Sequence, residues 1–302
     1  MKLILKPLEE YRIGLRQSNG IVIENVDVVS AFPSPTTVLG IIGKLNNAIP
    51  SNNSSEIEDL IHAYKSLTSN ELNPYSHKSN NPLIWGPMIY KGNDTSPYYP
   101  LLFSKLILNI EKYVKLAINP NISREDVVEE LHVQTRRMNQ INRSNRYTIH
   151  SFYQKFFSHE YTLEYCVNTN VKSGRIVELG GENRYGEVEI RDSECDYREG
   201  NYAVLLQPLL FETSKDYFTK IDNVKGLECV EEIYGILVEK GNRIDFKVKV
   251  IYYALGYGKV RRPMLQALPP GTVIKVKNEC KEANTLGILS ELGFGAIYKV
   301  KL

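Results

Sequence analysis

Apolar residues recur with two different spacings along this chain of 302 residues, and the spacings predict a mixture of strands and helices. Residues 2–6 and 21–29 read as short strands near the N-terminus. Residues 55–67 carry apolar side chains every three or four positions, which predicts an amphipathic helix. Residues 162–167 and 176–179 predict further strands in mid-chain. This order favours an α+β fold over a regular alternation of strand and helix.

A helix is predicted to begin directly after the segment Phe32-Pro33-Ser34-Pro35. Serine followed by proline is a favourable N-cap and first helical residue. Gly40 and Gly43 keep side chains off one face of this helix. We expect the amides at its start to be free to meet an anion, although an ordinary buried helix has the same pattern.

The remaining elements are predicted from shorter patterns. Residues 70–100 read as a long loop around a strand at 83–90, and the apolar residues 101–118 fit either strand or helix, with strand favoured. In the second half we expect strands at 202–211, 229–238, 246–254 and 272–276, short helices at 213–221 and 284–292, and a glycine turn at 293–295 before a last strand.

Composition excludes several classes of protein. Apolar residues make up 42% and charged residues 24%, which is typical of a globular chain. No stretch approaches the roughly 20 apolar residues that span a bilayer, and the first residues are too few and too charged for a signal peptide. We therefore expect a cytoplasmic protein.

The cysteines point the same way. Cys166, Cys195, Cys229 and Cys280 lie far apart and form no CxxC pair. We expect neither a disulfide framework nor a zinc site, and a reducing compartment fits best.

Positive charge is clustered although the formal net charge is only +2. Residues 131–158 contain no acidic residue and combine cations with amides and aromatic rings, the ingredients of single-stranded RNA recognition. Apolar arms flank a polar tip at 139–145, which predicts a long hairpin. Its cations are Arg136, Arg137, Arg143, Arg146 and Lys155.

A second basic segment, residues 240–262, contains Asp245 as its single acidic residue. Lys247 and Lys249 alternate with apolar residues there. A half-buried strand with a solvated lysine face explains those two lysines as well as RNA contact does.

Motifs of catalysis are absent from the sequence. It contains no GxxxxGK[ST], HExxH, GxSxG or DxDxDG pattern, and its five histidines show no metal-ligand spacing. No pair of carboxylates stands out as an acid/base couple. We expect a binding protein that is not an enzyme, with no cofactor and no metal.

Four motifs in order resemble the RAMP superfamily of CRISPR proteins. They are residues 32–40, the arginine-rich hairpin, residues 179–184 (LGGENR) and residues 292–295 (LGFG). The chain looks most like the subunit of type III-B (Cmr) effector complexes, which act in antiviral defence, that holds the 5′ end of the guide RNA.

The resemblance implies a fold and a set of partners. It implies two ferredoxin-like (RRM-like) modules, residues 1–200 with long inserts and a protruding β-hairpin thumb, and residues 201–302. Glycine-containing loops and the first helix would grip the 5′ handle of the crRNA, and the thumb would insert into the guide–target RNA duplex. The chain would dock onto the large polymerase-like subunit and onto the backbone RAMP subunits.

Candidate RNA-binding residues follow from the charge clusters and from the resemblance. They are Ser34, Thr36, Thr37, Arg136, Arg137, Arg143, Arg146, Lys259, Arg261, Arg262, Gly293 and Gly295. The superfamily often has a denser glycine loop near the C-terminus than Gly293 and Gly295 provide, so residues 256–262 are an alternative phosphate-facing loop.

Two other functions remain open at this point. A guide-processing endoribonuclease of the same superfamily needs a general base, for which His62 is the candidate. A pure protein scaffold would use the basic hairpin to dock an acidic partner.

Overall fold

The computed structural model describes most of the chain. The described ranges are 1–11, 13–14, 29–30, 32–48, 57–91, 97–100, 106–119, 128–130, 133–141, 148–157, 160–172, 175–179, 184–212, 221–240, 243–255 and 264–302. These residues form three α-helices and several antiparallel sheets, which confirms the predicted α+β class. The ferredoxin-like character of the modules stays a prediction.

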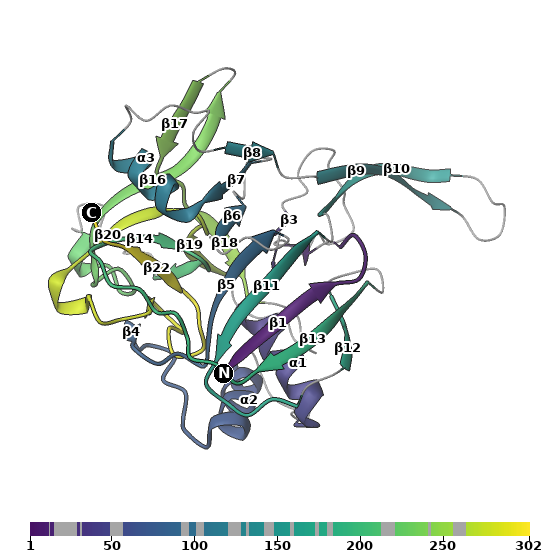
Figure 1. Cartoon of the computed structure of the whole chain (residues 1–302), viewed down its shortest axis with the longest axis horizontal. Coiled ribbons are helices and arrows are strands. Elements are labelled where there is room, and N and C mark those ends of the chain that lie inside the picture. The colour runs from purple at the N-terminus through teal and green to yellow at the C-terminus, as the bar shows by residue number, and fades with distance from the viewer. Residues whose placement is uncertain are drawn as a thin grey trace.

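The first half of the chain builds an eight-stranded sheet (Figure 1). Its strands, in spatial order, are β12 (Arg175–Glu178), β13 (Tyr185–Arg191), β1 (Lys2–Pro7), β11 (Tyr161–Val167), β5 (Ile84–Lys91), β6 (Tyr98–Pro100), β7 (Leu106–Asn109) and β8 (Val128–Glu130). Alternation along β1 buries Leu3 and Leu5 on the inner face. On the outer face Lys6 pairs with Glu189 at 2.8 Å. Ile4, on the same face as Lys6, is 2% exposed, so that face is covered at Ile4 and solvated at Lys6.

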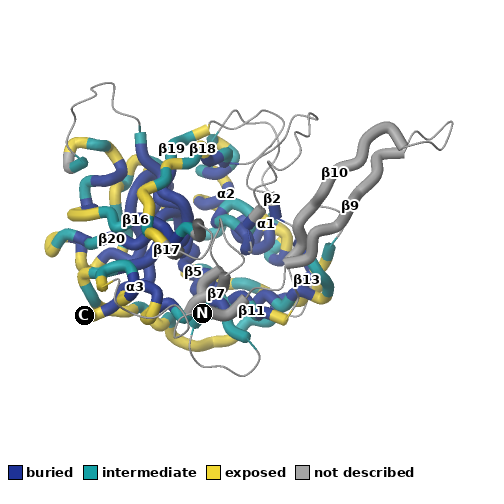
Figure 2. Tube along the Cα trace, turned by 90° about the horizontal axis from the view of Figure 1, so that it is seen from above, coloured by how far each residue is buried: buried dark blue, intermediate teal, exposed yellow. Residues whose placement is uncertain are grey.

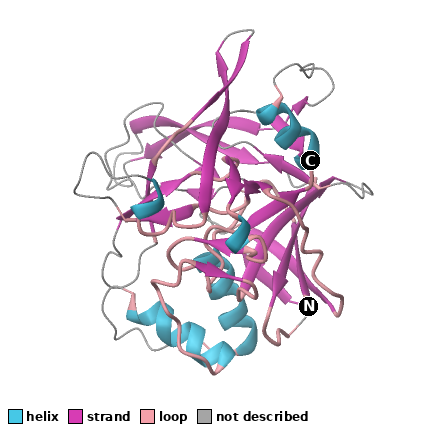
Figure 3. Cartoon of the chain, turned by 90° about the vertical axis from the view of Figure 1, so that its left-hand side faces the viewer, coloured by secondary structure: helices cyan, strands magenta, loops and turns pink. Residues whose placement is uncertain are grey.

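Two helices predicted from the sequence pack beside this sheet. α1 (Pro35–Asn46) begins at the predicted proline. The bounds of α2 (Glu58–Thr68) differ from the predicted 55–67 by at most three residues. α1 contacts β5 and β12 and buries Val38 and Ile42 completely. Figure 3 shows both helices gathered at the lower end of the molecule.

The second half builds a five-stranded and a three-stranded sheet. The five-stranded order is β17 (Arg243–Lys247), β16 (Val230–Lys240), β20 (Val273–Val276), β14 (Tyr202–Leu205) and β22 (Ile297–Val300). The three-stranded order is β15 (Leu209–Phe211), β19 (Met264–Leu268) and β18 (Ile251–Ala254). Smaller pairs are β2 (Ile13–Gly14) with β3 (Val29–Ser30), β4 (Lys78–Ser79) with β21 (Thr285–Leu286), and β9 (Val133–Ile141) with β10 (Thr148–Phe157). Short 3₁₀ helices lie at Ile221–Asn223 and Asn278–Cys280.

In the apolar segment 101–118, for which strand was favoured over helix, residues 106–109 form β7 and residues 110–118 form helix α3 (Ile110–Ile118). Residues 101–105 lie outside the described ranges. Asn109 at the end of β7 caps the helix and accepts a hydrogen bond from the Lys112 N–H at 3.2 Å. α3 crosses to the five-stranded sheet, where the Tyr113 hydroxyl donates to the Gly271 carbonyl at 2.7 Å. The same hydroxyl accepts from the Leu237 N–H at 3.0 Å. A helix from the first half thus covers the sheet of the second.

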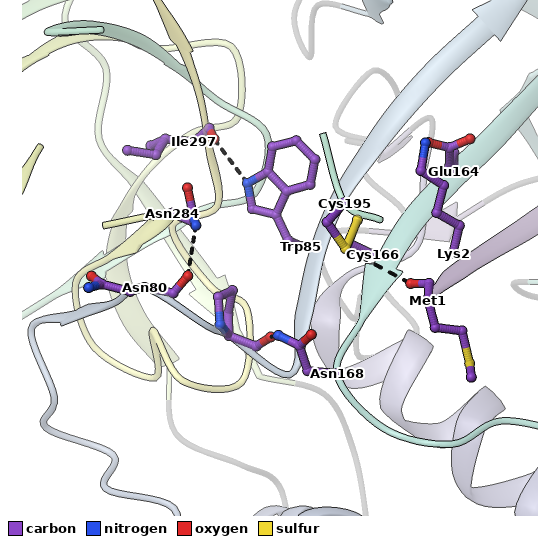
Figure 4. Close-up of a disulfide and its surroundings, with 11 residues drawn as sticks. Met1, Lys2, Asn80, Trp85, Glu164, Cys166, Asn168, Cys195, Asn284 and Ile297 are labelled. Carbon is purple, nitrogen blue, oxygen red and sulfur yellow. Dashed lines mark hydrogen bonds and ion pairs between the residues drawn. A yellow bond between two sulfur atoms is a disulfide. The ribbon is translucent and has the colours of Figure 1, made fainter. Parts of the chain in front are cut away.

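The larger of two apolar clusters in the described residues spans both halves of the chain, and the smaller one lies within the second half. A single cluster includes Leu3 and Leu5 of β1 together with Val204 of β14 and Leu237 of β16, and Figure 2 shows buried segments running through the middle of the molecule. The Trp85 indole N–H donates to the Ile297 carbonyl at 3.0 Å (Figure 4). The division at residue 200 stays a prediction, and burial is continuous across it.

The cysteines contradict the prediction from their sequence spacing. Cys166 forms a disulfide with Cys195 (Figure 4), and Cys229 forms one with Cys280, each with 5.7 Å between the Cα atoms. Residues 29 and 51 positions apart meet because strands and turns distant in sequence pack together. Disulfides are rare in a reducing compartment outside hyperthermophiles, so the cysteines no longer support the predicted reducing compartment.

The predicted helix at 284–292 is also absent. β21 is followed by turns in which Gly287, Leu289 and Gly293 have positive φ angles, which an α-helix does not contain. Among the three α-helices of the described residues, none is long and apolar enough to cross a membrane.

Candidate nucleic-acid interface

Ser34 holds the start of α1 in place. Its Oγ accepts from the Thr37 N–H at 3.4 Å and lies 3.0 Å from Thr36 Oγ1 and 3.1 Å from Thr37 Oγ1. All three residues are half-buried, so this hydroxyl cluster keeps part of its surface in solvent. The hydroxyl groups of Ser34, Thr36 and Thr37 therefore hold one another in place, and RNA contact by them stays a prediction.

The expectation of several free amides at this helix start was wrong. Pro35 has no N–H, the Thr37 N–H is capped by Ser34, and the Val38 N–H donates to the Ser34 carbonyl at 3.0 Å. The N–H groups of Ser34 and Thr36 have no hydrogen bond to the described residues. A ligand here would meet hydroxyl groups and two N–H groups rather than a ring of amides.

Buried polar side chains fix the residue before the cap. The Pro33 carbonyl accepts from the Tyr165 hydroxyl at 2.9 Å and from Gln207 Nε2 at 3.2 Å. Gln207 Nε2 also reaches the Gly86 carbonyl at 3.1 Å. Burial raises the pKa of the Tyr165 hydroxyl well above its usual value, as does the nearby Tyr11. Tyr165 and Gln207 therefore tie the loop before α1 to both halves of the molecule.

Tyr253 of β18 connects the second basic segment to the same place. Its hydroxyl hydrogen-bonds to Ser34, while burial raises its pKa to about 12. Tyr253 stands three residues before the segment 256–263, which joins β18 to β19. Lys259, Arg261 and Arg262 lie outside the described residues, and the strand that precedes them contacts the start of α1 through Tyr253.

The C-terminal glycine turn supports this arrangement from behind. The Phe294 ring packs edge-on against the Tyr253 ring at 5.7 Å between centroids. Gly293 and Gly295, on either side, are buried and have positive φ angles of 124° and 61°. A Cβ atom would lie 2.2 Å from the Ile84 carbonyl oxygen at Gly293 and 1.9 Å from that of Leu286 at Gly295. RNA contact by these glycines stays a prediction. Their positive φ angles and close backbone contacts place the Phe294 ring against the Tyr253 ring.

One face of α1 is open next to the hydroxyl cluster. Gly40 is exposed, and apart from its own helix backbone and chain neighbours no described atom lies within 4 Å of the position that a Cβ would take. Gly40 follows Thr36 by four residues and precedes Lys44 by four, so the three share a face. Lys44 is exposed and lies 3.8 Å from Glu178. The missing side chain at Gly40 leaves room for close approach by a backbone.

The basic mid-chain segment forms a hairpin that extends away from the body (Figure 1). Its strands are longer than predicted, and Arg136 and Arg137 pair with Gln154 and Tyr153 of the opposite strand. In the described residues β9 has β10 as its sheet partner. Arg143 and Arg146 fall in the segment 142–147, outside the described part of the chain.

The motif at residues 179–184 has a local role in the described structure. The Leu179 N–H donates to the Arg184 carbonyl at 2.7 Å, closing the turn between β12 and β13. The Arg184 guanidinium pairs with Glu9. Residues 180–183 lie outside the described ranges.

A cavity of about 570 Å³ lies elsewhere, beside the end of β22. Arg198, Lys281 and Lys299 line it together with Glu199 and Glu282, so its charges are mixed. Lys299 is 5% exposed and donates to the Lys281 carbonyl at 2.8 Å; burial lowers its pKa. Nothing in this lining matches the predicted RNA-binding set.

Catalytic and metal-binding groups gain no support from the described residues. His62 is exposed on α2. No group of three or more His, Cys, Asp or Glu residues in the described ranges could hold a metal ion.

Sequence reasoning missed Tyr165, Gln207 and Tyr253, the three buried side chains that position the start of α1. Tyrosine and glutamine in apolar strands give no signal of their own, because the partners are backbone or side-chain atoms more than 100 residues away.

Comparisons with known proteins show which solved structures share this fold. No family model and no curated protein matches the sequence. One similar chain belongs to the cryo-EM structure of the type III-B Cmr-beta bound to cognate target RNA and AMPPnP, state 1, with a TM-score of 0.63, 18% identity and 99% of each chain covered. Another belongs to the cryo-EM structure of the type III-B Cmr-beta bound to cognate target RNA, with a TM-score of 0.62, 17% identity, and 99% of this chain and 96% of that chain covered. At this level of identity the similarity shows a shared fold over the whole chain.

Proposed function

We propose that this chain is a subunit of a type III-B Cmr effector complex that holds the 5′ handle of the crRNA and does not cleave RNA. The observation that carries the proposal is the shared fold over 99% of both chains with a protein of the type III-B Cmr-beta bound to target RNA. The four motifs of the sequence agree with that family in type and order.

The geometry supports two roles within the site, nucleotide recognition and phosphate contact. The hydroxyl cluster of Ser34, Thr36 and Thr37 offers hydrogen-bond donors and acceptors on a fixed frame, which suits recognition of unpaired nucleotides. Lys259, Arg261 and Arg262, which follow Tyr253 in the sequence and lie outside the described residues, would add phosphate contacts.

The hairpin would act as the thumb. Arg136 and Arg137 stand on β9, and Arg143 and Arg146 belong to the segment 142–147, outside the described residues; all four would contact RNA. Guide paired with nearby target RNA is the predicted partner there. The large polymerase-like subunit and the backbone RAMP subunits are the proposed protein partners.

We leave Gly293 and Gly295 out of the proposed contact set. Both are buried, and the Gly295 N–H donates to the Pro208 carbonyl at 2.8 Å. Their contribution to binding would act through Phe294 and Tyr253.

The test is filter binding of a guide RNA with its natural 5′ handle, compared with a guide whose handle is scrambled, over a range of salt concentrations. R136A/R137A is expected to reduce affinity about 10- to 100-fold, because two charge-assisted contacts are lost. The slope of log K against log salt should flatten by about 0.7 for each lost phosphate contact.

The matched control is K112A/K115A, which removes the same charge from the exposed face of α3. It should leave affinity and slope unchanged. If both double variants lose guide affinity equally, net charge alone drives binding. If R136A/R137A loses no affinity, the hairpin does not act as the thumb. Metal-independent cleavage of a guide precursor that is lost in H62A would replace it with the nuclease function.

A further inference from the structure

A buried cation lines the cavity beside β22 and has few partners there. Lys299 is 5% exposed, and its ammonium donates to the Lys281 carbonyl at 2.8 Å. Among the described residues this carbonyl is its one hydrogen-bond acceptor, and no described carboxylate forms an ion pair with it. An ammonium group carries three N–H donors, so two of them have no described acceptor.

This arrangement is unfavourable for a side chain that serves the fold alone. Burying a charge without a counter-ion costs free energy, and an apolar side chain of similar volume is often at least as stable in its place. Burial lowers the pKa of Lys299, and the charges of Glu282 and Glu199 oppose this only in part. An anion in the cavity would complete the bonding of the buried ammonium.

The cavity has room for such an anion. Its volume of about 570 Å³ lies within the range of roughly 300–1,000 Å³ that is common for small-molecule sites. Its lysines outnumber its glutamates. The lysines are Lys281, Lys299 and Lys301, and the glutamates are Glu199 and Glu282.

The donors of the lining suit a phosphate group better than a carboxylate. Arg198, whose planar guanidinium could bind a carboxylate through two parallel bonds, is already paired with Asp196 at 2.6 Å. Lysines bind phosphate oxygens as point charges. Gly200 and Asn201 also line the cavity, and their N–H groups have no hydrogen bond to the described residues. Backbone N–H groups are common donors to phosphate.

We propose that the cavity beside β22 binds a small phosphate-bearing ligand, with the buried Lys299 ammonium as the central cation and the exposed Lys281 and Lys301 beside it. The lining shares no residue with the proposed guide-binding set, so the inference does not rest on the proposed function. A free ligand is favoured over an RNA chain because the volume is that of a small-molecule site.

The test is calorimetric titration of the full chain with inorganic phosphate in a buffer that contains no other phosphate. The wild-type chain should bind one phosphate. K299M should lower the affinity at least about tenfold, because a charge-assisted contact is lost.

The matched control is K78M. Lys78 on β4 donates to the Glu279 carbonyl at 3.0 Å, in the same 3₁₀ turn that Lys281 follows, but it does not line the cavity. This variant removes the same charge and the same kind of bond, and it should leave phosphate affinity unchanged.

Two further measurements separate ligand binding from a structural role of Lys299. Without phosphate, K299M should unfold at the same urea concentration as the wild-type chain or at a higher one. E199Q/E282Q keeps Lys299 and removes two exposed opposing charges, so it should raise phosphate affinity about threefold. This second variant tests the site even if K299M does not fold.

Four results would overturn the inference. They are no phosphate binding by the wild-type chain, equal loss of affinity in K299M and K78M, unchanged or weaker binding in E199Q/E282Q, and unchanged phosphate affinity in K299M with a lower urea midpoint. The last result would make Lys299 a structural residue of the 3₁₀ turn. Displacement of the bound phosphate by excess guide RNA would assign the cavity to RNA instead of a small ligand.

Discussion

The start of α1 and the mid-chain hairpin are built in opposite ways. The residues around Ser34 are tied down by Tyr165, Gln207 and Tyr253, all buried, from three different strands or strand ends. In the hairpin, β9 pairs with β10 and with no other described strand, and the pair extends from the body (Figure 1). One region is rigid and nearly uncharged, and the other is rich in arginine and held at its base.

This difference predicts different contributions to RNA binding. A fixed hydroxyl cluster discriminates between nucleotides because its donors and acceptors cannot adjust to the wrong one. Arginines on an extended hairpin supply affinity that falls with salt, since each phosphate contact releases counterions. We therefore expect handle preference to depend on the start of α1 and salt dependence to depend on the hairpin.

The largest expected effect concerns the stability of the body. Removal of Cys229–Cys280 by C229S/C280S should lower the free energy of unfolding by about 4.1 kcal/mol, and C166S/C195S by about 3.6 kcal/mol, from loop-closure entropy alone. Urea unfolding with and without reductant measures both losses. If the body and the hairpin are independent, the salt dependence of RNA binding should stay unchanged in variants that remain folded. An unfolding midpoint that does not change under reductant would contradict the two disulfides.

The second effect separates the hairpin from the body. Replacing residues 132–158 with a short Gly/Ser linker should change the free energy of unfolding by less than about 1 kcal/mol, because β9 and β10 pair with each other. Guide affinity should fall about 100-fold, and the salt slope should flatten by about 2.8 if four arginines contact phosphates. A protein that unfolds on this deletion would show that the hairpin is part of the core.

A smaller effect is expected at Tyr253. Y253F removes the hydrogen bond to Ser34 and keeps the ring against Phe294, which should cost about 1 kcal/mol of stability. Preference for the natural handle over a scrambled one should fall about fivefold with the salt slope unchanged. The control is Y113F, which removes an equally buried hydroxyl far from α1 and should lower stability without altering preference.

The same tyrosine predicts an alkaline limit to stability. Its pKa is raised from 10.0 to about 12, so its contribution is fully present below pH 10 and is lost as the pH rises from 10 to 12. Y253F should reduce the loss of stability across that range. Unfolding curves of both proteins between pH 9 and pH 12, read at matched ionic strength, measure it.

The smallest effect compares two glycines of one helix. G40A places a methyl group in open space and should stabilise α1 by up to about 1 kcal/mol, whereas G43A meets the Ala48 carbonyl oxygen at 3.3 Å and gains less. If RNA approaches the face beside Thr36, G40A should lower handle affinity despite its greater stability, and G43A should not. Unchanged affinity in G40A would place the RNA on another face.

Local signals in the sequence were sufficient for the start of α1 and for strands such as β5, β11 and β16. They did not indicate β13 or β19, and the single strand predicted at 246–254 is divided by residues 248–250 into β17 and β18. Ser34 followed by Pro35 fixes a helix start through atoms within three residues, and β5 and β11 follow their apolar runs. The hairpin strands were placed but their length was underestimated, because polar residues continue the pairing to Ile141.

Features that depend on distant contacts could not be predicted. α3 forms within an apolar run because Tyr113 bonds to Gly271 and Leu237, which lie more than 120 residues away. The disulfides join cysteines whose spacing carries no pattern. Residues 284–292 have helical spacing, but Gly287 and Gly293 adopt positive φ angles to pass close to other backbone atoms.

The sequence predicted the residues of the candidate site but not which of them contact one another. The sequence indicated the hydroxyl residues, the arginines and the glycine turn separately. Their connection runs from Phe294 to Tyr253 to Ser34, and each step joins residues far apart in the chain. A single sequence contains no record of such a pairing.

Photo-crosslinking tests the central claim most directly. A guide RNA with 4-thiouridine in its 5′ handle is assembled with the chain and its partner subunits, irradiated, and the crosslinked peptides are identified by mass spectrometry. The account predicts handle crosslinks within residues 32–48 and 256–263, with guide positions next to the handle crosslinked to residues 133–157. Handle crosslinks confined to the cavity beside β22, or to subunits other than this one, would contradict it.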